Sequence, residues 1–568
     1  MPHGLWIKCS TKGKKLQCRG KRRGLHILTL DNFVCYSYYL EKNAAGNRGN
    51  KKKEKLCVKT ECGKRTEKRR WRFAGWLVGG LATVVYFLAA VSRSVAEWLD
   101  ETYGVGFDQL LYVLASPLKG TGQDVVGECV AVCLPAVREA AVPYLIGFGA
   151  VLLLRHFWRF AIGTETHSFE PLALTELVML GVGIWAAVGA YRHADSLLDI
   201  SSYLEGRKLA STIYEEEYVD PLTVEVTAPE KKRNLICIYL ESMETTYAST
   251  EDGGAQAVNY IPNLTSLARE NVSFSETEGL GGFRSALRTT WTMAALLGTS
   301  SGVPFSFPVD GNSMNERETF ATGLTTLGDI LAAEGYHNEF LCGSDSEFGG
   351  RKDYYTQHGD YEIFDLFTAR DKGYIGEDYY VWWGFEDRRL YEIAKDEATR
   401  LAGEDEPFNL TLLTVDTHFQ EGYRCPDCGN EGGTLAADVV SCADRQVSDF
   451  IAWCKEQSFY EDTTIVILGD HPRMDKSLVG ETDVFERRVY NCFINAAAET
   501  ATESCRKFTS LDIFPTTLAA LGYTIEGDRL GLGANLFAGV ETLAERMGYE
   551  ALDAELLKNS NYYIRHFA

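Results

Sequence analysis

The sequence lacks several features that would assign it to a simple class of protein. Its 568 residues, 45% hydrophobic and 24% charged, show none of the compositional bias of a disordered or fibrous chain. It has one C-x-x-C run, Cys425 to Cys428, without the second pair that a zinc knuckle needs. No motif that reads nucleic-acid grooves accompanies its basic segment, and the remainder is strongly acidic, so we expect no nucleic-acid partner.

Charge is distributed unevenly along the chain. Residues 1–72 hold 21 Lys and Arg against 5 Asp and Glu, a net charge of +16, whereas residues 73–568 carry a net charge of −38. A heavy Lys and Arg load next to an apolar segment places that end of a membrane protein in the cytoplasm. We therefore predict a basic cytoplasmic head over residues 1–72.

Three apolar segments predict helices that cross a membrane. Phe73–Ser92 has no charge over twenty residues, enough helix for a hydrocarbon core of about 30 Å, and no small-residue cleavage site follows it. Ala140–Leu154 and Leu172–Tyr191, which carries only Glu176, are weaker spans for which buried core helices are the alternative. Three crossings make a multi-pass protein of the cell membrane, with everything after about residue 195 outside the cytoplasm.

These segments divide the chain into four parts. After the head, residues 73–194 form the predicted transmembrane domain, in which the interrupted apolar stretch 105–120 favours the membrane interface. Residues 195–233 are polar and indicate a linker or juxtamembrane segment. From 234 to 568, short apolar runs alternate with helical stretches of mixed polarity, as in a mainly parallel sheet covered by helices. We predict an extracytoplasmic α/β domain there.

Three apolar runs of this domain end in side chains that bind metals. Leu235–Leu240 runs into Glu241, Leu410–Val415 into Asp416 and His418, and Ile465–Leu468 into Asp470 and His471. Because the carboxyl ends of parallel strands meet at one edge of a sheet, we expect these groups to converge. Helix capping explains any one of the acids, but the three endings together favour a metal site. Carboxylate and imidazole ligands suit manganese, magnesium or zinc.

The cysteines are expected to serve structure rather than this metal. Outside the cytoplasm disulfides are permitted, so we predict that Cys425, Cys428 and Cys442 staple the loop after His418. The sequence does not define the pairing. A redox role for the C-x-x-C run is a minor alternative.

A metal site alone does not indicate which reaction an enzyme catalyses, so we looked for a residue that could act as the nucleophile. Residues 279–304 contain a glycine-rich turn and a predicted helix through Trp291 to Leu297, with hydroxyls at its start: Ser285, Thr289, Thr290 and Thr292. An alcohol in the first helical turn lies among unpaired N–H groups that favour alkoxide character and a phosphate oxyanion, with N-capping as the alternative. The turn Phe348–Arg351 could aim the Arg351 guanidinium at phosphate oxygens, with a surface ion pair as the alternative.

Several separate motifs, in order, carry a resemblance to a known family. They are SPLKGT at 116–121, NLICIYLES at 234–242, TTWT at 289–292, TVDTH at 414–418, LGDH at 468–471 and GDRLGLGANLF at 527–537. Together they resemble the membrane-bound lipoteichoic acid synthase and phosphoglycerol transferase group of the alkaline phosphatase and sulfatase superfamily. The resemblance is closest to the branch that decorates periplasmic glucans, and it implies an alkaline-phosphatase-like α/β/α domain.

The resemblance also implies roles for residues at the matching motifs. Glu241, Asp470 and His471 would bind one divalent ion, usually Mn2+, and Thr289 would be both a metal ligand and the nucleophile. His418 and Arg351 would contact the phosphoryl group or the acceptor. In this group the threonine typically follows a glycine, whereas Arg288 precedes it here, which keeps Thr290 open as the alternative.

The function implied is transfer of phosphoglycerol from phosphatidylglycerol to a hydroxyl of a glycan or teichoic-type polymer. Thr289 would attack phosphorus, release diacylglycerol and form a covalent phospho-threonine intermediate, with His418 as acid or base. The alternatives are phosphoethanolamine transfer on the same scaffold, or a metal-stabilised membrane sensor without catalysis. A sulfatase would need a C-x-P-x-R run for its modified cysteine, and the sequence has none.

Overall fold

The structure is a computed structural model. It describes residues 26–30, 33–37, 62–103, 106–107, 110–111, 123–161, 171–306, 320–430, 432–480, 482–500 and 502–567. Most of the basic head and of the predicted interfacial segment 105–120, including the SPLKGT motif, therefore lies outside the described residues. Two compact units can be distinguished, Met1–Val84 with Val151–Val182 and Val85–Ala150 with Gly183–Ala568.

Three long helices match the three predicted spans. They are α1 (Cys62–Tyr103), α3 (Gln123–Ala161) and α4 (Pro171–Leu198). Within them, Phe73–Glu101, Val130–Leu153 and Glu176–Leu198 are long and apolar enough to cross a membrane. Large apolar side chains such as Trp76, Leu81, Ile146 and Trp185 are mostly exposed along these helices, as lipid contact requires.

Glu176, the one acid of the predicted third span Leu172–Tyr191, is packed against a glycine. A Cβ atom added to Gly75 of α1 would lie 2.7 Å from Oε1 of Glu176 in α4. Small residues let transmembrane helices approach closely, and polar side chains within spans face the protein rather than lipid. Both residues belong to the smaller unit.

The α/β domain is built on a six-stranded sheet with the order β6-β5-β7-β4-β8-β9. Its strands are β4 (Asn234–Leu240), β5 (His337–Cys342), β6 (Glu362–Phe364), β7 (Phe408–Leu413), β8 (Thr463–Gly469) and β9 (Asn491–Ile494). All neighbours are parallel except β9, which runs antiparallel to β8. The predicted mainly parallel sheet is confirmed.

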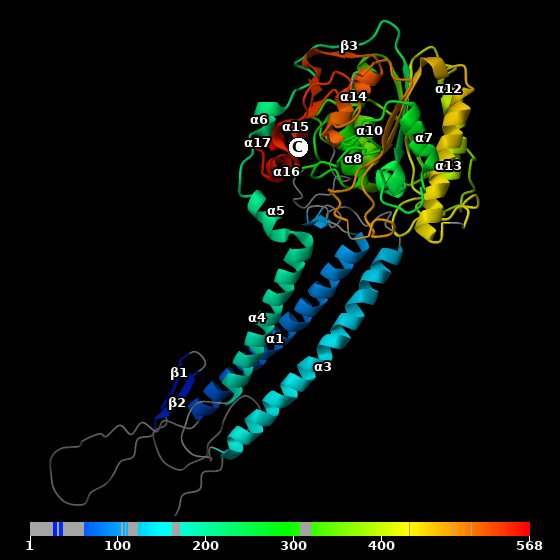
Figure 1. Ribbon diagram of the computed structural model, residues 1–568. Helices are drawn as coiled ribbons and strands as arrows, with labels where there is room; N and C mark the ends of the chain where they lie inside the picture. The colour runs from blue at the N-terminus through cyan, green and yellow to red at the C-terminus, as the bar shows by residue number, and fades with distance from the viewer. Residues whose placement is uncertain are drawn as a thin grey trace, which may run out of the picture. The chain divides into compact units, whose positions relative to one another are not determined.

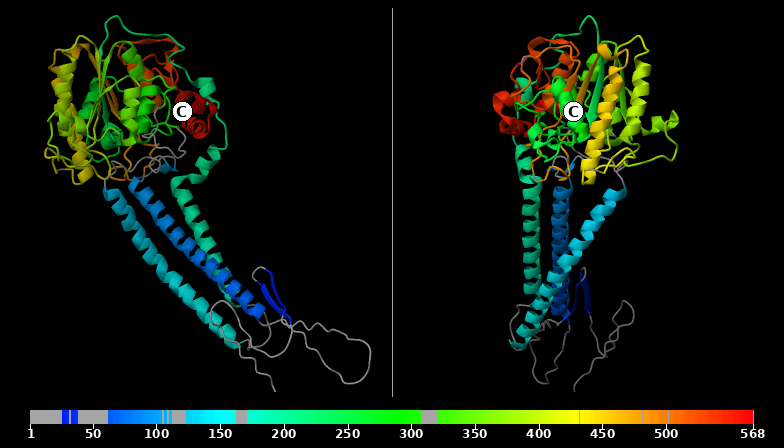
Figure 2. Two further views of the ribbon diagram at one scale, coloured as in Figure 1. Left: turned by 180° about the vertical axis from the view of Figure 1, so that it is seen from behind. Right: turned by 45° about the vertical axis from the view of Figure 1, so that its right-hand side comes forward.

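Helices cover both faces of the sheet (Figures 1 and 2), because its strands are apolar on both sides. In β4, Leu235, Cys237 and Tyr239 enter one core, and the alternating residues enter the other. The helices are α7 (Pro262–Glu270), α8 (Thr292–Ser301), α9 (Leu327–Ala333), α10 (Arg351–Gln357), α11 (Leu366–Asp371), α12 (Asp387–Leu401), α13 (Leu435–Lys455) and α14 (Ile513–Ala520), followed by α15 (Leu543–Met547), α16 (Tyr549–Leu557) and α17 (Asn561–His566).

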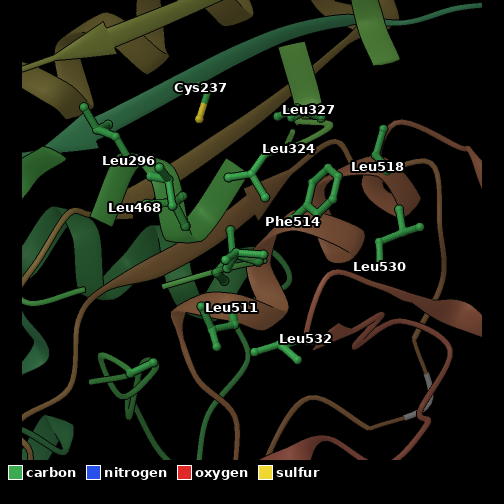
Figure 3. Packing of buried hydrophobic residues seen from close by; sticks show 14 of the residues in the cluster. Cys237, Leu296, Leu324, Leu327, Leu468, Leu511, Phe514, Leu518, Leu530 and Leu532 are labelled. Atoms are coloured by element: carbon green, nitrogen blue, oxygen red, sulfur yellow. The ribbon is translucent and has the colours of Figure 1, made fainter. Parts of the chain in front are cut away.

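Close packing in the first of these cores holds α8 and α14 against the sheet. Figure 3 shows Leu296 of α8, Leu468 of β8 and Phe514 and Leu518 of α14 pointing into this core. These four side chains are completely buried. Burial of this kind fixes the start of α8 relative to the strand ends.

The segment predicted as a linker is regular in structure. It contains α5 (Ile200–Gly206), α6 (Ile213–Glu217) and β3 (Val226–Thr227), which pairs with β10 (Thr524–Ile525). Ser211 donates a hydrogen bond of 2.9 Å to Glu555 of α16. Two further short ladders join β1 (His26–Leu30) to β2 (Phe33–Ser37) and β11 (Arg529–Leu530) to β12 (Gly533–Ala534).

Candidate active site and metal centre

The site lies where three neighbouring parallel strands end. β4 pairs with β7 on one side and with β8 on the other, and Leu240 lies opposite Gly469 in the ladder. Glu241 follows β4 directly, and Asp470 and His471 follow β8. One oxygen or nitrogen ligand atom from each of these three residues lies within 4.8 Å of the others.

The donor set of this cluster fits a divalent cation. All three side chains are buried, with His471 Nε2 at 3.5 Å from Glu241 Oε1 and 3.3 Å from Asp470 Oδ2. Asp470 Oδ2 makes no hydrogen bond to any part of the chain that the structure describes. His471 Nδ1 lies 2.8 Å from the carbonyl oxygen of Pro472, which can only accept a hydrogen bond. Nδ1 therefore carries the proton, and Nε2 presents a lone pair to the cluster, as in metal-binding histidines.

Ser242 fixes the two carboxylates. Its N–H donates to Asp470 Oδ1 and its hydroxyl donates to Glu241 Oε1, both at 2.7 Å. Its φ of 52° lies in the left-handed region, which costs a non-glycine residue about 1–2 kcal/mol. The two hydrogen bonds offset this strain and orient both ligands toward one point.

The cluster brings the negative charges of two carboxylates close together in a buried space. Burial, reinforced by the charge of Glu241, raises the pKa of Asp470 to about 7. Burial alone would raise the pKa of Glu241, but the charges of His418 and His471 outweigh it and lower that pKa. Burial would lower the pKa of His471, yet Asp470 and Glu241 together raise it. A bound cation would relieve the repulsion between the two carboxylates.

Thr292, not Thr289, is the hydroxyl that the structure brings to the cluster. Thr292 is the first residue of α8, and its Oγ1 lies 3.2 Å from His471 Nε2 and 3.4 Å from Glu241 Oε2. Thr289 precedes the helix and is completely buried, and its Oγ1 contacts the carbonyl of Ala286 at 2.8 Å and Ser510 Oγ at 2.7 Å. The expectation that Thr289 joins Glu241 and His471 is corrected accordingly.

His418 faces the same cluster from the third strand end. Its charge is felt by Glu241, and Thr417 beside it donates a hydrogen bond of 2.5 Å to the Glu241 carbonyl. The imidazole packs edge-on against the Trp383 ring, with centroids 4.8 Å apart. Burial lowers the pKa of His418, and the neighbouring Glu241 carboxylate opposes this shift in part.

Arg351 is buried at the start of α10. Its Nη2 donates to Ser344 Oγ at 3.1 Å and to the Asp345 carbonyl at 2.7 Å. Its guanidinium lies over the Phe348 ring, 5.6 Å from the centroid, and Phe348 contacts Trp383 at 5.5 Å. Phe348 and Trp383 thus connect Arg351 to His418 through aromatic contacts. Among the described residues, Arg351 makes no direct contact with the candidate metal ligands.

Two functional candidates were not singled out from the sequence. Ser242 gives no sequence signal other than its place one residue after Glu241. Arg473, two residues after His471, is fully buried and donates to the Thr417 carbonyl at 3.2 Å and to Asp475 Oδ1 at 2.8 Å. The rule that a nucleophile belongs in the first helical turn selects Thr292 once the start of α8 is known.

A cavity of about 560 Å3 lies beside these segments. Its lining includes Arg288 and Thr290, just before α8, and Arg473, just after His471. Phe107 and Tyr203, from the segments that follow the first and third spans, line it as well. The cavity therefore combines basic and aromatic side chains close in sequence to the catalytic candidates with five acidic ones: Asp100, Asp199, Asp475, Asp483 and Asp553.

Comparison with known proteins identifies the domain. A model of the sulfatase family matches residues 233–523, which is half of the chain. The chain belongs to the sulfatase family. The predicted superfamily and the predicted α/β fold class are thereby confirmed. Enzymes of this superfamily use a divalent metal ion, and Glu241, Asp470 and His471 offer a site for one.

Curated relatives share a single name. Phosphoglycerol transferase I of Xanthomonas campestris pv. campestris (strain ATCC 33913) is 30% identical over 493 residues, which cover 84% of this chain and 61% of that protein. The same enzyme of Salmonella choleraesuis is 29% identical over 450 residues, 77% of this chain and 54% of that protein. The chain thus spans about half to three fifths of the length of these relatives. With its three apolar helices, it is a membrane protein.

Two solved structures show a partial likeness to this chain. The lipoteichoic acid synthase LtaP from Listeria monocytogenes is 18% identical, with a TM-score of 0.42 over 57% of this chain and 80% of that one. The lipooligosaccharide phosphoethanolamine transferase A from Neisseria meningitidis is 14% identical, with a TM-score of 0.44 over 78% of this chain and 84% of that one.

Proposed function

We propose that this protein is a phosphotransferase that moves phosphoglycerol from phosphatidylglycerol to an acceptor hydroxyl through a covalent intermediate on Thr292. The observation that carries the proposal is the position of Thr292 Oγ1, 3.2 Å from His471 Nε2 and 3.4 Å from Glu241 Oε2, at the N-terminus of α8. The helix dipole and the unpaired N–H groups of that turn favour a phosphate oxyanion there.

Glu241, Asp470, His471 and Thr292 would hold one divalent ion, for which manganese is the leading candidate and magnesium or zinc the alternatives. Such an ion, when bound, lowers the pKa of an alcohol and neutralises charge on phosphoryl oxygens. Ser242 keeps both carboxylates oriented toward this position through its two hydrogen bonds.

The reaction has two displacements at phosphorus. In the first, Thr292 Oγ1 forms a bond to phosphorus while the bond from phosphorus to the diacylglycerol oxygen breaks, and the Thr292 proton ends on that oxygen. In the second, an acceptor oxygen bonds to phosphorus, the bond to Thr292 breaks, and Thr292 recovers a proton. Neutral His418 suits the role of base for the acceptor hydroxyl, because burial keeps its pKa low.

Phosphatidylglycerol is the preferred donor because the relatives are named phosphoglycerol transferases. The cavity lined by Arg288, Phe107 and Tyr203 is the candidate place for the donor lipid, because its two aromatic side chains lie on segments that follow membrane-spanning helices. Arg351, joined to His418 through Phe348 and Trp383, is the candidate for positioning the acceptor side.

The acceptor is proposed to be a hydroxyl of a glycan or teichoic-type polymer in the cell envelope. This requires a multi-pass topology with the catalytic domain outside the cytoplasm. Support comes from the charge of residues 1–72, whose net +16 favours a cytoplasmic position before the first of three spans.

The test is to trap the intermediate in the purified full chain. Incubation with phosphatidylglycerol and manganese should release diacylglycerol and add the mass of glycerophosphate minus water to the peptide that contains Thr292. Thr292→Val, which removes only the hydroxyl, should abolish both signals. Thr289→Val is the matched control, because it removes a hydroxyl three residues away that bonds to Ser510, and it should keep the adduct.

Diacylglycerol release by Thr292→Val at the parental rate, or an adduct that maps to Thr289, would refute the nucleophile. Phosphatidylethanolamine offered in place of phosphatidylglycerol tests the donor. If only that lipid labels Thr292, the mechanism stands and the head-group assignment is wrong. If neither lipid releases diacylglycerol or labels the protein, the non-catalytic alternative is favoured.

A further inference from the structure

Three cysteine side chains gather between the loop after β7 and the helix α13. Cys425 and Cys428 lie on the loop, and Cys442 lies on the second turn of α13. Cys425 Sγ is 3.5 Å from Cys428 Sγ and 3.8 Å from Cys442 Sγ, and all three sulfur atoms lie within 4.8 Å of one another. These residues form a cluster separate from Glu241, Asp470 and His471.

The sulfur positions do not correspond to the predicted disulfide staple. A disulfide bond is about 2.05 Å long and joins only two of three sulfurs. No cysteine is in a disulfide within the part of the chain that the structure describes. A staple would leave the third thiol of this cluster buried beside the bond without a chemical reason for its position.

The same positions match the edges of a metal tetrahedron. A zinc–thiolate bond of about 2.3 Å with tetrahedral angles places neighbouring sulfur atoms about 3.8 Å apart. The two shorter separations, 3.5 and 3.8 Å, agree with that edge. Thiolates are the ligands that select zinc over magnesium or manganese. The C-x-x-C pair supplies two ligands and Cys442 the third, without the second C-x-x-C pair of a knuckle.

Gln446 closes the fourth side of the cluster. It lies four residues after Cys442 on α13, and its Nε2 is 3.3 Å from Cys425 Sγ and 3.5 Å from Cys442 Sγ. Its Oε1 is buried and has no hydrogen-bond partner among the described residues. A half-turn of the amide, whose two ends have the same shape, would direct this oxygen toward the sulfurs instead.

We propose that Cys425, Cys428 and Cys442 bind a structural zinc ion, with the Gln446 amide at the fourth position. This ion is separate from the divalent ion at the ends of the strands and has a different ligand chemistry. Its place in the fold is the junction between α13 and the loop that begins at His418.

The consequence of such an ion is a fixed loop. At its near end, Tyr423 N–H donates to the Asp416 carbonyl at 2.7 Å, and Glu421 N–H donates to Asp475 at 3.1 Å. At its far end, Gly432 N–H donates to Asp438 of α13 at 2.7 Å. A zinc ion between these ends would hold the loop on α13, and through Asp416 it would help to position His418.

The experiment measures metal in the purified full chain grown with zinc. We expect about one zinc per chain to remain in Asp470→Asn, which disables the other metal site, and to be lost in Cys428→Ser and Cys442→Ser. Cys454→Ser is the matched control, because Cys454 is a buried cysteine on α13 outside the cluster, and it should keep the zinc. Replacement of zinc by cobalt should give the thiolate-to-cobalt charge-transfer absorption, which oxygen and imidazole ligands cannot produce.

Three results would overturn the inference. One is equal zinc in the parent and in Cys428→Ser. Another is a cobalt spectrum without the thiolate band. The third is a zinc-free parent in which two of the three thiols resist alkylation until a reductant is added, because that chain contains the disulfide. If the serine variants do not fold, the folded parent is titrated with an organomercurial instead. Zinc should be released as the thiols react, and thiols that react without zinc release would contradict the site.

Discussion

The buried ion pair of Glu244 and Arg487, close in sequence to the candidate metal ligands, allows a quantitative test of the structure. Glu244 is completely buried, and its Oε1 accepts hydrogen bonds from Arg487 Nη1 at 2.5 Å and from the Arg473 N–H at 2.8 Å. Glu244→Ala would leave the Arg487 guanidinium, which is 7% exposed, without its counter-charge. Breaking one side of a buried pair costs about 3–5 kcal/mol, because the remaining charge is desolvated and unpaired. We therefore expect the free energy of unfolding to fall by about that amount.

The assay is thermal and chemical unfolding of the full chain in detergent. The decisive comparison is between Glu244→Ala and the double variant that combines Glu244→Leu and Arg487→Met. Replacing both charges by apolar groups of similar volume removes the unpaired charge, so the double variant should be more stable than Glu244→Ala. A change below about 1 kcal/mol in the single variant would show that the pair is solvated. A double variant as unstable as the single one would show that the loss comes from packing or from the Arg473 hydrogen bond instead.

Three further expectations concern the edge of the sheet. Manganese at one hundred times its dissociation constant should raise the free energy of unfolding of the parent by about 2.7 kcal/mol and raise its Tm. Asp470→Asn should show no such rise in Tm, and a rise equal to the parent's would exclude Asp470 as a ligand. Gly469→Ala should lower Tm and yield, because its Cβ would lie 1.9 Å from the Met243 carbonyl oxygen, while Gly429→Ala, with open space around it, should leave both unchanged. Trp383→Ala should slow transfer from Thr292 to an acceptor hydroxyl by roughly tenfold to a hundredfold, because it removes the ring that packs against His418. It should keep the manganese-dependent rise in Tm, and loss of that rise would show that the site as a whole is disrupted.

The sheet could be predicted from the sequence because its strands are apolar on both faces and end in polar residues. The runs before Glu241 and Asp470 have lengths and compositions that fit buried parallel strands, and β4 and β8 occupy them within one residue or two. The contacts of the segment 195–233, predicted as a linker or juxtamembrane helix, could not be predicted, because they are with α16 and β10, more than 290 residues later in the chain. Composition carries no information about partners at that distance.

The candidate metal ligands could be predicted from the sequence and the candidate nucleophile could not, for a reason that lies in the start of α8. A strand end is marked by the last apolar residue, which fixes Glu241 and Asp470 to within one position. The helix start is marked only weakly, since Trp291 at the N-cap makes no side-chain capping bond and four hydroxyls surround it. Thr289 lies three residues before Thr292, outside the helix, and the position at which α8 begins decides which hydroxyl faces His471 and which faces Ser510. Only the packing of Leu296 and its neighbours against the sheet sets that register, so the choice of nucleophile depends on tertiary structure.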